Sequence, residues 1–401
     1  MKIKTIIVVS LRGGSIFKAQ NEKKQRGRAR HSLRAVVSLQ PYGAHGVTRP
    51  TGHRQIGNWI LALSLAAAGC STMPRAGKPE PRRGDEIVAA GQMFHTGARV
   101  VLWMDPGGYD AYRVERRFAP FNKSDWADTT AEVKTMKSPN RYSMRAASLT
   151  PEQIEKVRGG GWDLPLLQNV VDQLVMHFDV AGTSRSCFQT LQDVRDLSVH
   201  FMVDLDGTIY QTLDVKERAW HATTSNDRSI GIEIANIGAY ATPGTNDLLA
   251  WYHHDANGQT TVTIPARFGD GGLRTKNFVA HPAHPDLIHG TIQGQELVQY
   301  DFTPQQYDAL TKLTASLCKI FPKLKCRYPV DSDGHLITHK LPADELKNYE
   351  GVLGHYHIQT NKIDPGPAFD WDRVVGGANK ILREESGEFP PRGAEQLTSE
   401  R

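Results

Sequence analysis

Cysteine is scarce in this chain. Only four of the 401 residues are cysteine, and no two of them have the spacing of a zinc finger. A cysteine-based structural metal site is therefore excluded. Cys318 and Cys326 are close enough in sequence to form a disulfide in an oxidising compartment, and two unpaired buried thiols are the alternative.

Acidic residues are almost absent from the first 69 positions. This segment holds twelve Lys or Arg and a single acid, Glu22, so its formal charge is +11. Because the whole chain has a formal charge of +5, the remaining residues carry −6. The basic surplus thus belongs to the leader, and the remainder gives no indication of a nucleic-acid partner.

The apolar run at residues 59–70 is too short for a membrane-spanning helix, which needs roughly 20 residues. It follows Arg54 and ends in small residues, which predicts a secretory signal. Its last residues, Ala68-Gly69-Cys70, resemble the box of bacterial lipoproteins, in which the cysteine is lipidated after cleavage. By the same resemblance, Ser71 implies the periplasmic face of a Gram-negative outer membrane. An ordinary secretion signal with Cys70 incidental is the alternative.

Composition divides the chain into five parts. Residues 1–55 are longer and more basic than an ordinary signal start; they form an extended leader or follow an unused start, with Val47 as the alternative initiator. The segment after the signal is rich in Pro, Arg and Gly, which is typical of a flexible tether. The expected parts are a leader and signal at 1–70, a tether at 71–95, an N-terminal extension of unassigned role at 96–163, a main domain at 164–374 with an insert at 239–300, and a polar, frayed tail at 375–401.

The main domain shows alternating strand and helix patterns. Apolar runs predict strands over 170–178 and 229–235, and helical spacing predicts a helix over 186–197. The Asp206-Gly207 pair predicts a hairpin within 199–213. Thr303-Pro304-Gln305-Gln306 predicts a capped helix start, and Thr150-Pro151-Glu152-Gln153 predicts another. The insert has no sustained periodicity, and a loop of this length is expected to border the active site.

Two histidines and one aspartate are candidates for a metal site. His177 ends an apolar run, and His355 and Asp364 lie on one short segment near the C-terminus. Two imidazoles and one carboxylate leave the fourth position of zinc open for water, which is typical of a catalytic site and indicates a metallohydrolase. His357 competes with His355 for this role, and the Gly-His start of the motif favours His355.

A second metal site is not expected in the insert. Its histidines show no ligand-like spacing with carboxylates. They are His253, His254, His281, His284 and His289.

Five segments in order carry a resemblance to a known family. They are Val175-Met176-His177-Phe178, Ser198-Val199-His200-Phe201, Arg218-Ala219-Trp220-His221-Ala222, Ser229-Ile230-Gly231-Ile232-Glu233 and Lys362-Ile363-Asp364-Pro365-Gly366. Together, over about residues 165–372, they resemble the zinc-dependent N-acetylmuramoyl-L-alanine amidases of the type-2 amidase family. That family includes phage amidase-type lysozymes and is related to the animal peptidoglycan recognition proteins.

The resemblance implies a fold and a set of roles. The fold would be α/β, with a central mixed β-sheet flanked by helices. His177, His355 and Asp364 would hold Zn²⁺. Glu233 would be the catalytic acid and base, and Lys362 would stabilise the oxyanion. Substrate contacts would come from His200, Trp220, His221 and Asn236, with packing roles equally open for His200 and His221.

The same resemblance indicates a branch and a substrate. Phe178 after the first histidine and Asn226-Asp227 before the Arg-Ser-Ile-Gly-Ile-Glu segment look more like the lipoprotein amidases of broad specificity than the cytoplasmic anhydro-muropeptide enzymes. We therefore expect a monomeric, membrane-anchored peptidoglycan hydrolase. A non-catalytic peptidoglycan-binding module and an amidase for another peptide-like amide are the alternatives, because a fold does not determine a substrate.

Overall fold

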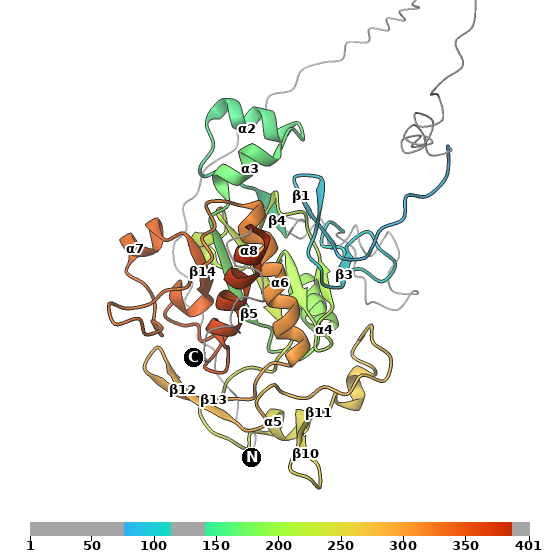
Figure 1. Ribbon diagram of the computed structural model, residues 1–401, viewed down its shortest axis with the longest axis vertical. Helices are drawn as coiled ribbons and strands as arrows, with labels where there is room; N and C mark the ends of the chain where they lie inside the picture. The colour runs from blue at the N-terminus through green and yellow to red at the C-terminus, as the bar shows by residue number, and fades with distance from the viewer. Residues whose placement is uncertain (1–75, 114–140, 387–401) are drawn as a thin grey trace, which may run out of the picture. The chain divides into compact units, whose positions relative to one another are not determined.

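The computed structural model describes residues 76–113 and 141–386 (Figure 1). The chain divides into two units after Lys78, and the features below belong to the second unit, which begins at Pro79. The expected signal and Cys70 lie outside the described residues. Within the described part of the chain, every helix is too short or too polar to span a membrane.

A six-stranded mixed sheet forms the centre of the second unit. The four strands from β14 to β6 are parallel, β7 is antiparallel to β6, and β3 is parallel to β7. In spatial order the strands are β14 (Gly351–Gly354), β5 (Gln173–Phe178), β9 (Ser229–Ile234), β6 (Phe201–Val203), β7 (Ile209–Gln211) and β3 (Val100–Leu102). The mixed sheet expected from the sequence is confirmed.

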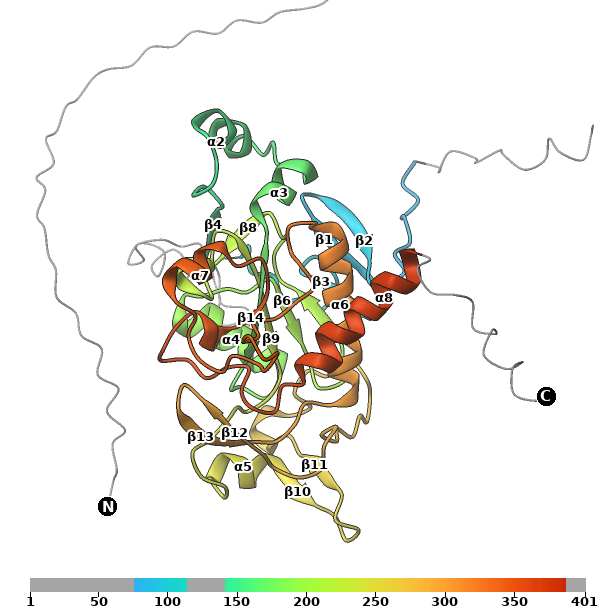
Figure 2. The same cartoon turned by 60° about the vertical axis from the view of Figure 1, so that its left-hand side comes forward.

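Helices cover both faces of this sheet. On one face, the leucines of α6 (Pro304–Ile320) belong to the same apolar cluster as Leu174 and Met176 of β5, and α8 (Gly377–Ser386) packs against α6 (Figures 1 and 2). On the other face, α4 (Ser184–Gln189) and α7 (Ala343–Asn348) contribute to two smaller apolar clusters. Because side chains alternate along a strand, His177 shares this second face with Val175.

The capped helix starts are confirmed. Thr303 accepts a hydrogen bond from the Gln306 backbone N–H at 3.1 Å, and the Gln306 side chain accepts one from the Thr303 N–H at 2.8 Å. Thr150 and Gln153 form the same reciprocal pair at the start of α2 (Pro151–Arg158). The Asp206-Gly207 hairpin joins β6 to β7 as expected.

Two predicted boundaries were wrong. The strand predicted from residue 170 begins at Gln173, because Asp163 caps a short helix, α3 (Leu164–Val170), by accepting from the Leu166 N–H. The helix predicted over 186–197 is α4, which continues into a π-helical turn, η2 (Thr190–Arg195).

The N-terminal segments belong to the folded unit. Residues 86–95, expected within the tether, form the hairpin β1 (Glu86–Ala89) and β2 (Gln92–His95), and the residues of β1 are buried. The 96–163 extension supplies β3 to the main sheet, and it supplies β4 (Tyr142–Met144), which pairs with β8 (Glu217–Ala219). Part of the extension is therefore built into the fold. The buried apolar side chains of β3 explain this, because they pack within the main domain.

The insert and the tail also differ from expectation. The insert contains α5 (Asn246–Trp251) and two hairpins, β10 (Tyr252–His254) with β11 (Thr260–Val262) and β12 (Ile288–Ile292) with β13 (Gln295–Gln299) (Figure 2). The strands β10 and β11 have three residues each and are too short to give a periodic sequence signal. A π-helical turn, η6 (Asp372–Gly376), runs into the predicted tail and is followed there by α8. Three 3₁₀ turns complete the described elements: η3 (Thr223–Ser225), η4 (Ala266–Phe268) and η5 (His355–His357).

Candidate active site

Parallel strand pairing brings the candidate residues to one edge of the sheet. His177 on β5 is the register partner of Glu233 on β9. On the other side of β5, Gly354 is the partner of Met176, so that His355 leaves β14 beside His177. The carboxyl ends of neighbouring parallel strands meet at one edge, which is where α/β sheets bind their ligands.

Asp364 lies between the two histidines. One oxygen of its carboxylate, Oδ2, is 2.8 Å from Nδ1 of His177 and 3.0 Å from Nδ1 of His355. The loop that carries Asp364 returns to the strand end, where the Tyr356 N–H donates to the Asp364 carbonyl at 3.2 Å. All three side chains are buried, and their ligand atoms lie within 4.8 Å of one another. This donor set fits a catalytic zinc ion.

The ionisation of these groups suits a cation. Burial alone would raise the pKa of Asp364, but the facing His355 and His177 outweigh it and hold that pKa well below its ordinary value. Burial, together with His355, lowers the pKa of His177 to about 4. The centre therefore holds a carboxylate anion at Asp364 and a neutral imidazole at His177, which are the forms that bind a metal.

Glu233 is a half-buried acid with spare hydrogen-bonding capacity. Its Oε2 is buried and has no hydrogen-bond partner among the described residues. Burial raises the pKa of Glu233 well above its ordinary value; Asp364 and Asp179 raise it further, while Lys362 opposes them. A carboxyl group in this condition can carry a proton between reacting atoms.

Lys362 places a positive charge at the same centre. It is half-buried on the loop between His355 and Asp364, and its charge acts on both Glu233 and His177. The structure thus brings together all five residues predicted as ligands or catalytic groups.

The four predicted substrate contacts separate into two groups. His200 and Asn236 are buried and are occupied by internal hydrogen bonds: His200 with Gly231 and Glu217, and Asn236 with Tyr300 and Gly238. Both side chains are engaged inside the protein, and their contact with a substrate stays a prediction. Trp220 and His221 are half-buried; Trp220 donates to Ser143 at 3.3 Å, whereas His221 contacts His177 directly.

The competing histidine has a structural role. His357 Nδ1 accepts from the Gly354 N–H at 2.8 Å, and its Nε2 donates to the Ile337 carbonyl at 2.6 Å. Both ring nitrogens are therefore occupied, and burial lowers its pKa to about 3. His355 is the histidine that faces Asp364.

Other clusters of ligand-type residues do not resemble a metal centre. The insert histidines form no group of three potential ligands among residues 76–113 and 141–386. In the cluster of Asp85, Glu86 and His95, the Glu86 carboxylate already accepts from two backbone N–H groups.

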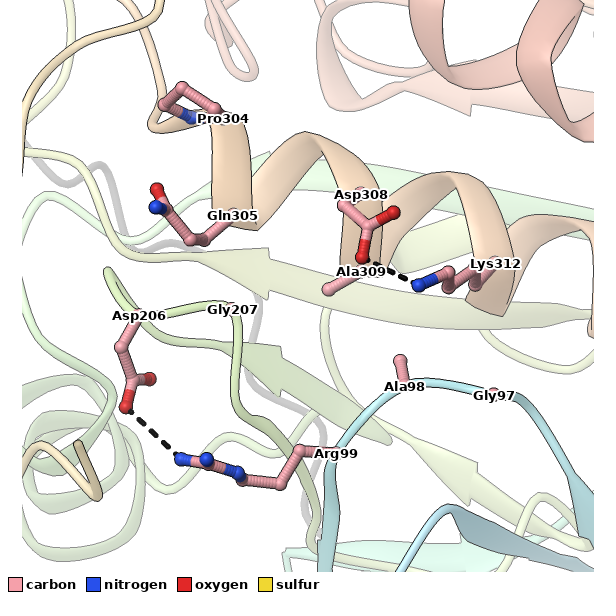
Figure 3. A pocket seen from close by; sticks show the side chains of 10 residues that line it. All are labelled: Gly97, Ala98, Arg99, Asp206, Gly207, Pro304, Gln305, Asp308, Ala309 and Lys312. Atoms are coloured by element: carbon pink, nitrogen blue, oxygen red, sulfur yellow. Dashed lines mark hydrogen bonds and ion pairs between the residues drawn. The ribbon is translucent and has the colours of Figure 1, made fainter.

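A separate pocket lies beside the start of α6 (Figure 3). Its volume is about 400 Å³, and it is lined in part by Arg99, Asp206, Asp308 and Lys312. Arg99 pairs with Asp206 at 3.7 Å, and Lys312 pairs with Asp308 at 2.7 Å, so its charges are compensated internally. None of the candidate catalytic residues lines this pocket.

Sequence reasoning missed two residues at the centre. Gln359 Oε1 lies 2.7 Å from Nε2 of His355, and Ser229 Oγ lies 3.2 Å from Nε2 of His221. Gln359 follows His355 by four residues, a spacing that could have indicated a contact on a helical turn. Ser229 carries no comparable signal.

The fold and this centre define a class: an α/β protein with a metallohydrolase-type site at the carboxyl edge of a mixed sheet. A family model described as N-acetylmuramoyl-L-alanine amidase matches residues 167–367, which is half of the chain. The chain belongs to this family, and it is a peptidoglycan N-acetylmuramoyl-L-alanine amidase.

Three solved structures show weak similarity to the chain. A selenomethionine derivative of AmpD is 18% identical over 59% of this chain and 89% of that chain, with a TM-score of 0.27. AmiD from E. coli, in complex with anhydro-N-acetylmuramic acid-L-Ala-D-γ-Glu-L-Lys, is 21% identical over 52% of this chain and 57% of its own, with a TM-score of 0.27. AmiA from Staphylococcus aureus is 11% identical over 62% and 99%, with a TM-score of 0.30. No curated protein sequence matches the chain.

Proposed function

We propose that this amidase is a zinc enzyme, with His177, His355 and Asp364 as the protein ligands. The observation that carries the proposal is the convergence of two imidazole Nδ1 atoms on one Asp364 oxygen, at 2.8 and 3.0 Å. A zinc ion in this position would lower the pKa of a bound water and polarise the scissile carbonyl.

Glu233 is the proton carrier in this proposal. The water oxygen bonds to the lactyl carbonyl carbon of N-acetylmuramic acid, and the bond from that carbon to the L-alanine nitrogen breaks. Glu233 accepts a proton from the water and returns one to the leaving amine. Its pKa, raised by burial and by Asp364, suits a group that holds a proton and then releases it to the amine.

Lys362 stabilises the negative charge that develops on the carbonyl oxygen. Its position between the ligand residues of the loop supports this role, and its charge already acts on Glu233. Fixed positive charge in a buried site stabilises an oxyanion more than it would in water.

Digestion of purified peptidoglycan tests the reaction. We expect free stem peptides, identified by mass, which disappear when a zinc chelator is added and return with added zinc. Wall binding and bound zinc without peptide release would instead support a recognition module or a different amide substrate. The glycan ends of the products report whether intact wall or anhydro-muropeptides are preferred, and broad use of both is expected from the lipoprotein-type motifs.

We further propose that Cys70 is lipidated and anchors the enzyme at the periplasmic face of the outer membrane. The support is the sequence alone, namely the apolar run before Cys70 and the serine after it. Labelled palmitate should be incorporated into the wild-type chain and not into Cys70→Ala. Equal labelling of the two chains would contradict the anchor.

A further inference from the structure

Each candidate ligand histidine contacts a second side chain through the ring nitrogen that does not face Asp364. Each turns Nδ1 toward Asp364 and Nε2 toward a second side chain. For His355 the second partner is Gln359, and for His177 it is His221. A histidine can bind a metal through one nitrogen only when that nitrogen is deprotonated, and the bond made by the other nitrogen determines which tautomer is present.

Gln359 determines the tautomer of His355. Its Oε1 is an acceptor and lies 2.7 Å from Nε2 of His355, so the proton of that ring belongs on Nε2. The Nδ1 lone pair is then free and faces Asp364. Gln359 is only half-buried, and its carbonyl accepts from the Gln293 side chain at 3.1 Å, which anchors its backbone.

His221 and Ser229 support His177 in the same way. His221 Nδ1 lies 3.0 Å from Nε2 of His177, and His221 Nε2 lies 3.2 Å from the Ser229 hydroxyl. Because imidazole and hydroxyl groups can each donate or accept, His221 Nδ1 can accept a hydrogen bond from the Nε2–H of His177 when His177 Nδ1 binds a cation.

The ring of His221 is fixed by its surroundings. A Cβ atom at Gly231 would lie 2.7 Å from His221 Nδ1, so the absence of a side chain there makes room for the ring. The side-chain oxygen of Asn226 accepts from the backbone N–H groups of His221 and Ala222, at 3.1 and 2.6 Å. The ring plane stands at 83° to that of His177.

We propose that Gln359 and the pair His221–Ser229 are positioning residues, which hold the two ligand imidazoles with Nδ1 toward the metal and thereby set its affinity. This inference depends on the proposed zinc function. It also gives His221 a different role from the substrate contact expected from the sequence.

Zinc affinity of the full chain tests the inference. We would measure the zinc Kd by competition with a chromophoric chelator and, in parallel, the thermal midpoint of the metal-free protein. Gln359→Leu and His221→Phe should each weaken zinc binding by about 10- to 100-fold, the usual effect of removing such a partner. Gln359→Glu, which keeps an acceptor oxygen, should stay near wild type. Gln168→Leu, a half-buried glutamine of α3 whose side chain donates to the Ile320 carbonyl, is the matched control.

The outcomes separate the inference from the proposed function. If wild type binds zinc and both Gln359→Leu and His221→Phe bind it equally well, the inference fails while the zinc site stands. If only the thermal midpoint changes, these residues are structural and the inference also fails. If wild type does not bind zinc, the proposed function fails and the inference fails with it.

Discussion

His177 and Glu233 are register partners on the parallel strands β5 and β9. The strand pairing therefore places an imidazole that faces Asp364 beside an acid whose Oε2 has no hydrogen-bond partner among the described residues. In the proposed mechanism, metal binding and proton transfer therefore depend on side chains of two adjacent strands, and the two functions should be separable by mutation.

Glu233→Gln should keep zinc and lose turnover. The amide retains the size of the carboxyl group but cannot accept a proton, and a positioned general acid and base contributes about 10²- to 10⁴-fold. The measurement is kcat on purified muropeptide, with the zinc content determined on the same sample. Full activity of this variant would eliminate Glu233 as the proton carrier.

His355→Ala and His357→Ala should have opposite effects. The first should lose zinc, because His355 faces Asp364, whereas the second should keep it. His357→Ala should instead lower the free energy of unfolding by about 1–3 kcal/mol, since the Gly354 N–H and the Ile337 carbonyl lose their buried partner. Zinc content and denaturant unfolding distinguish the two. If His357→Ala lost zinc at normal stability, His357 and not His355 would be the zinc ligand.

The sequence allowed prediction of those features whose signals are local. The continuous apolar run before His177, the Asp206-Gly207 turn and the Thr303 capping box each lie within a few residues, and each formed as predicted. The candidate site could be proposed from the sequence because five motifs occur in the same order as in a known family. His177 alone, at the end of one strand, would not have been sufficient.

Features that depend on distant partners could not be predicted in this way. β3 belongs to the sheet only because it pairs with β7, more than 100 residues later. The short hairpins of the insert are defined by a shared apolar cluster that contains Trp251 and Tyr300. The second partners of the ligands were missed for the same reason. Ser229, at the start of β9, carries no sequence signal of its own, because its role depends on the contact with His221 that only the fold creates.

Acid should narrow the stability gap between wild type and His200→Gln. Burial and Arg145 lower the pKa of His200 from 6.5 to about 3. Below pH 6.5 the unfolded chain binds a proton at His200 that the folded chain does not. The stability that neutral His200 contributes to the fold is therefore fully present above pH 6.5 and is lost as the pH falls toward 3. At pH 5 the loss is about 2 kcal/mol. Unfolding free energies of both proteins at pH 7.5 and 5 provide the check. A constant gap would show that the pKa of His200 is the same in the folded and the unfolded chain.

Gln299→Leu, a substitution in the insert, should reduce the zinc affinity of the centre. The Gln299 side chain donates to the Pro365 carbonyl at 3.1 Å and accepts from the Ala368 N–H at 3.0 Å, which fixes the loop after Asp364. Loss of these buried bonds should cost about 1–3 kcal/mol of stability and reduce zinc affinity. Gln295→Leu, exposed on the same hairpin, is the control. Equal effects of the two changes would mean that the loop does not depend on the insert.

A chain trimmed to 164–386 should fail to fold, although it contains the whole region that matches the family. It lacks β3 and Arg145, which is a fully buried arginine. The Arg145 guanidinium donates to four backbone carbonyls, those of Val215, Asn226, Asp227 and Ser229. Arg145→Met isolates the second effect: it keeps volume but leaves those carbonyls without their donor, which should cost on the order of 4 kcal/mol. Arg158→Met, on the exposed part of the same segment, should change stability by about 0.5 kcal/mol or less. Denaturant unfolding of the full-length variants measures both, and a stable, soluble 164–386 chain would show that the N-terminal segment is dispensable to the fold.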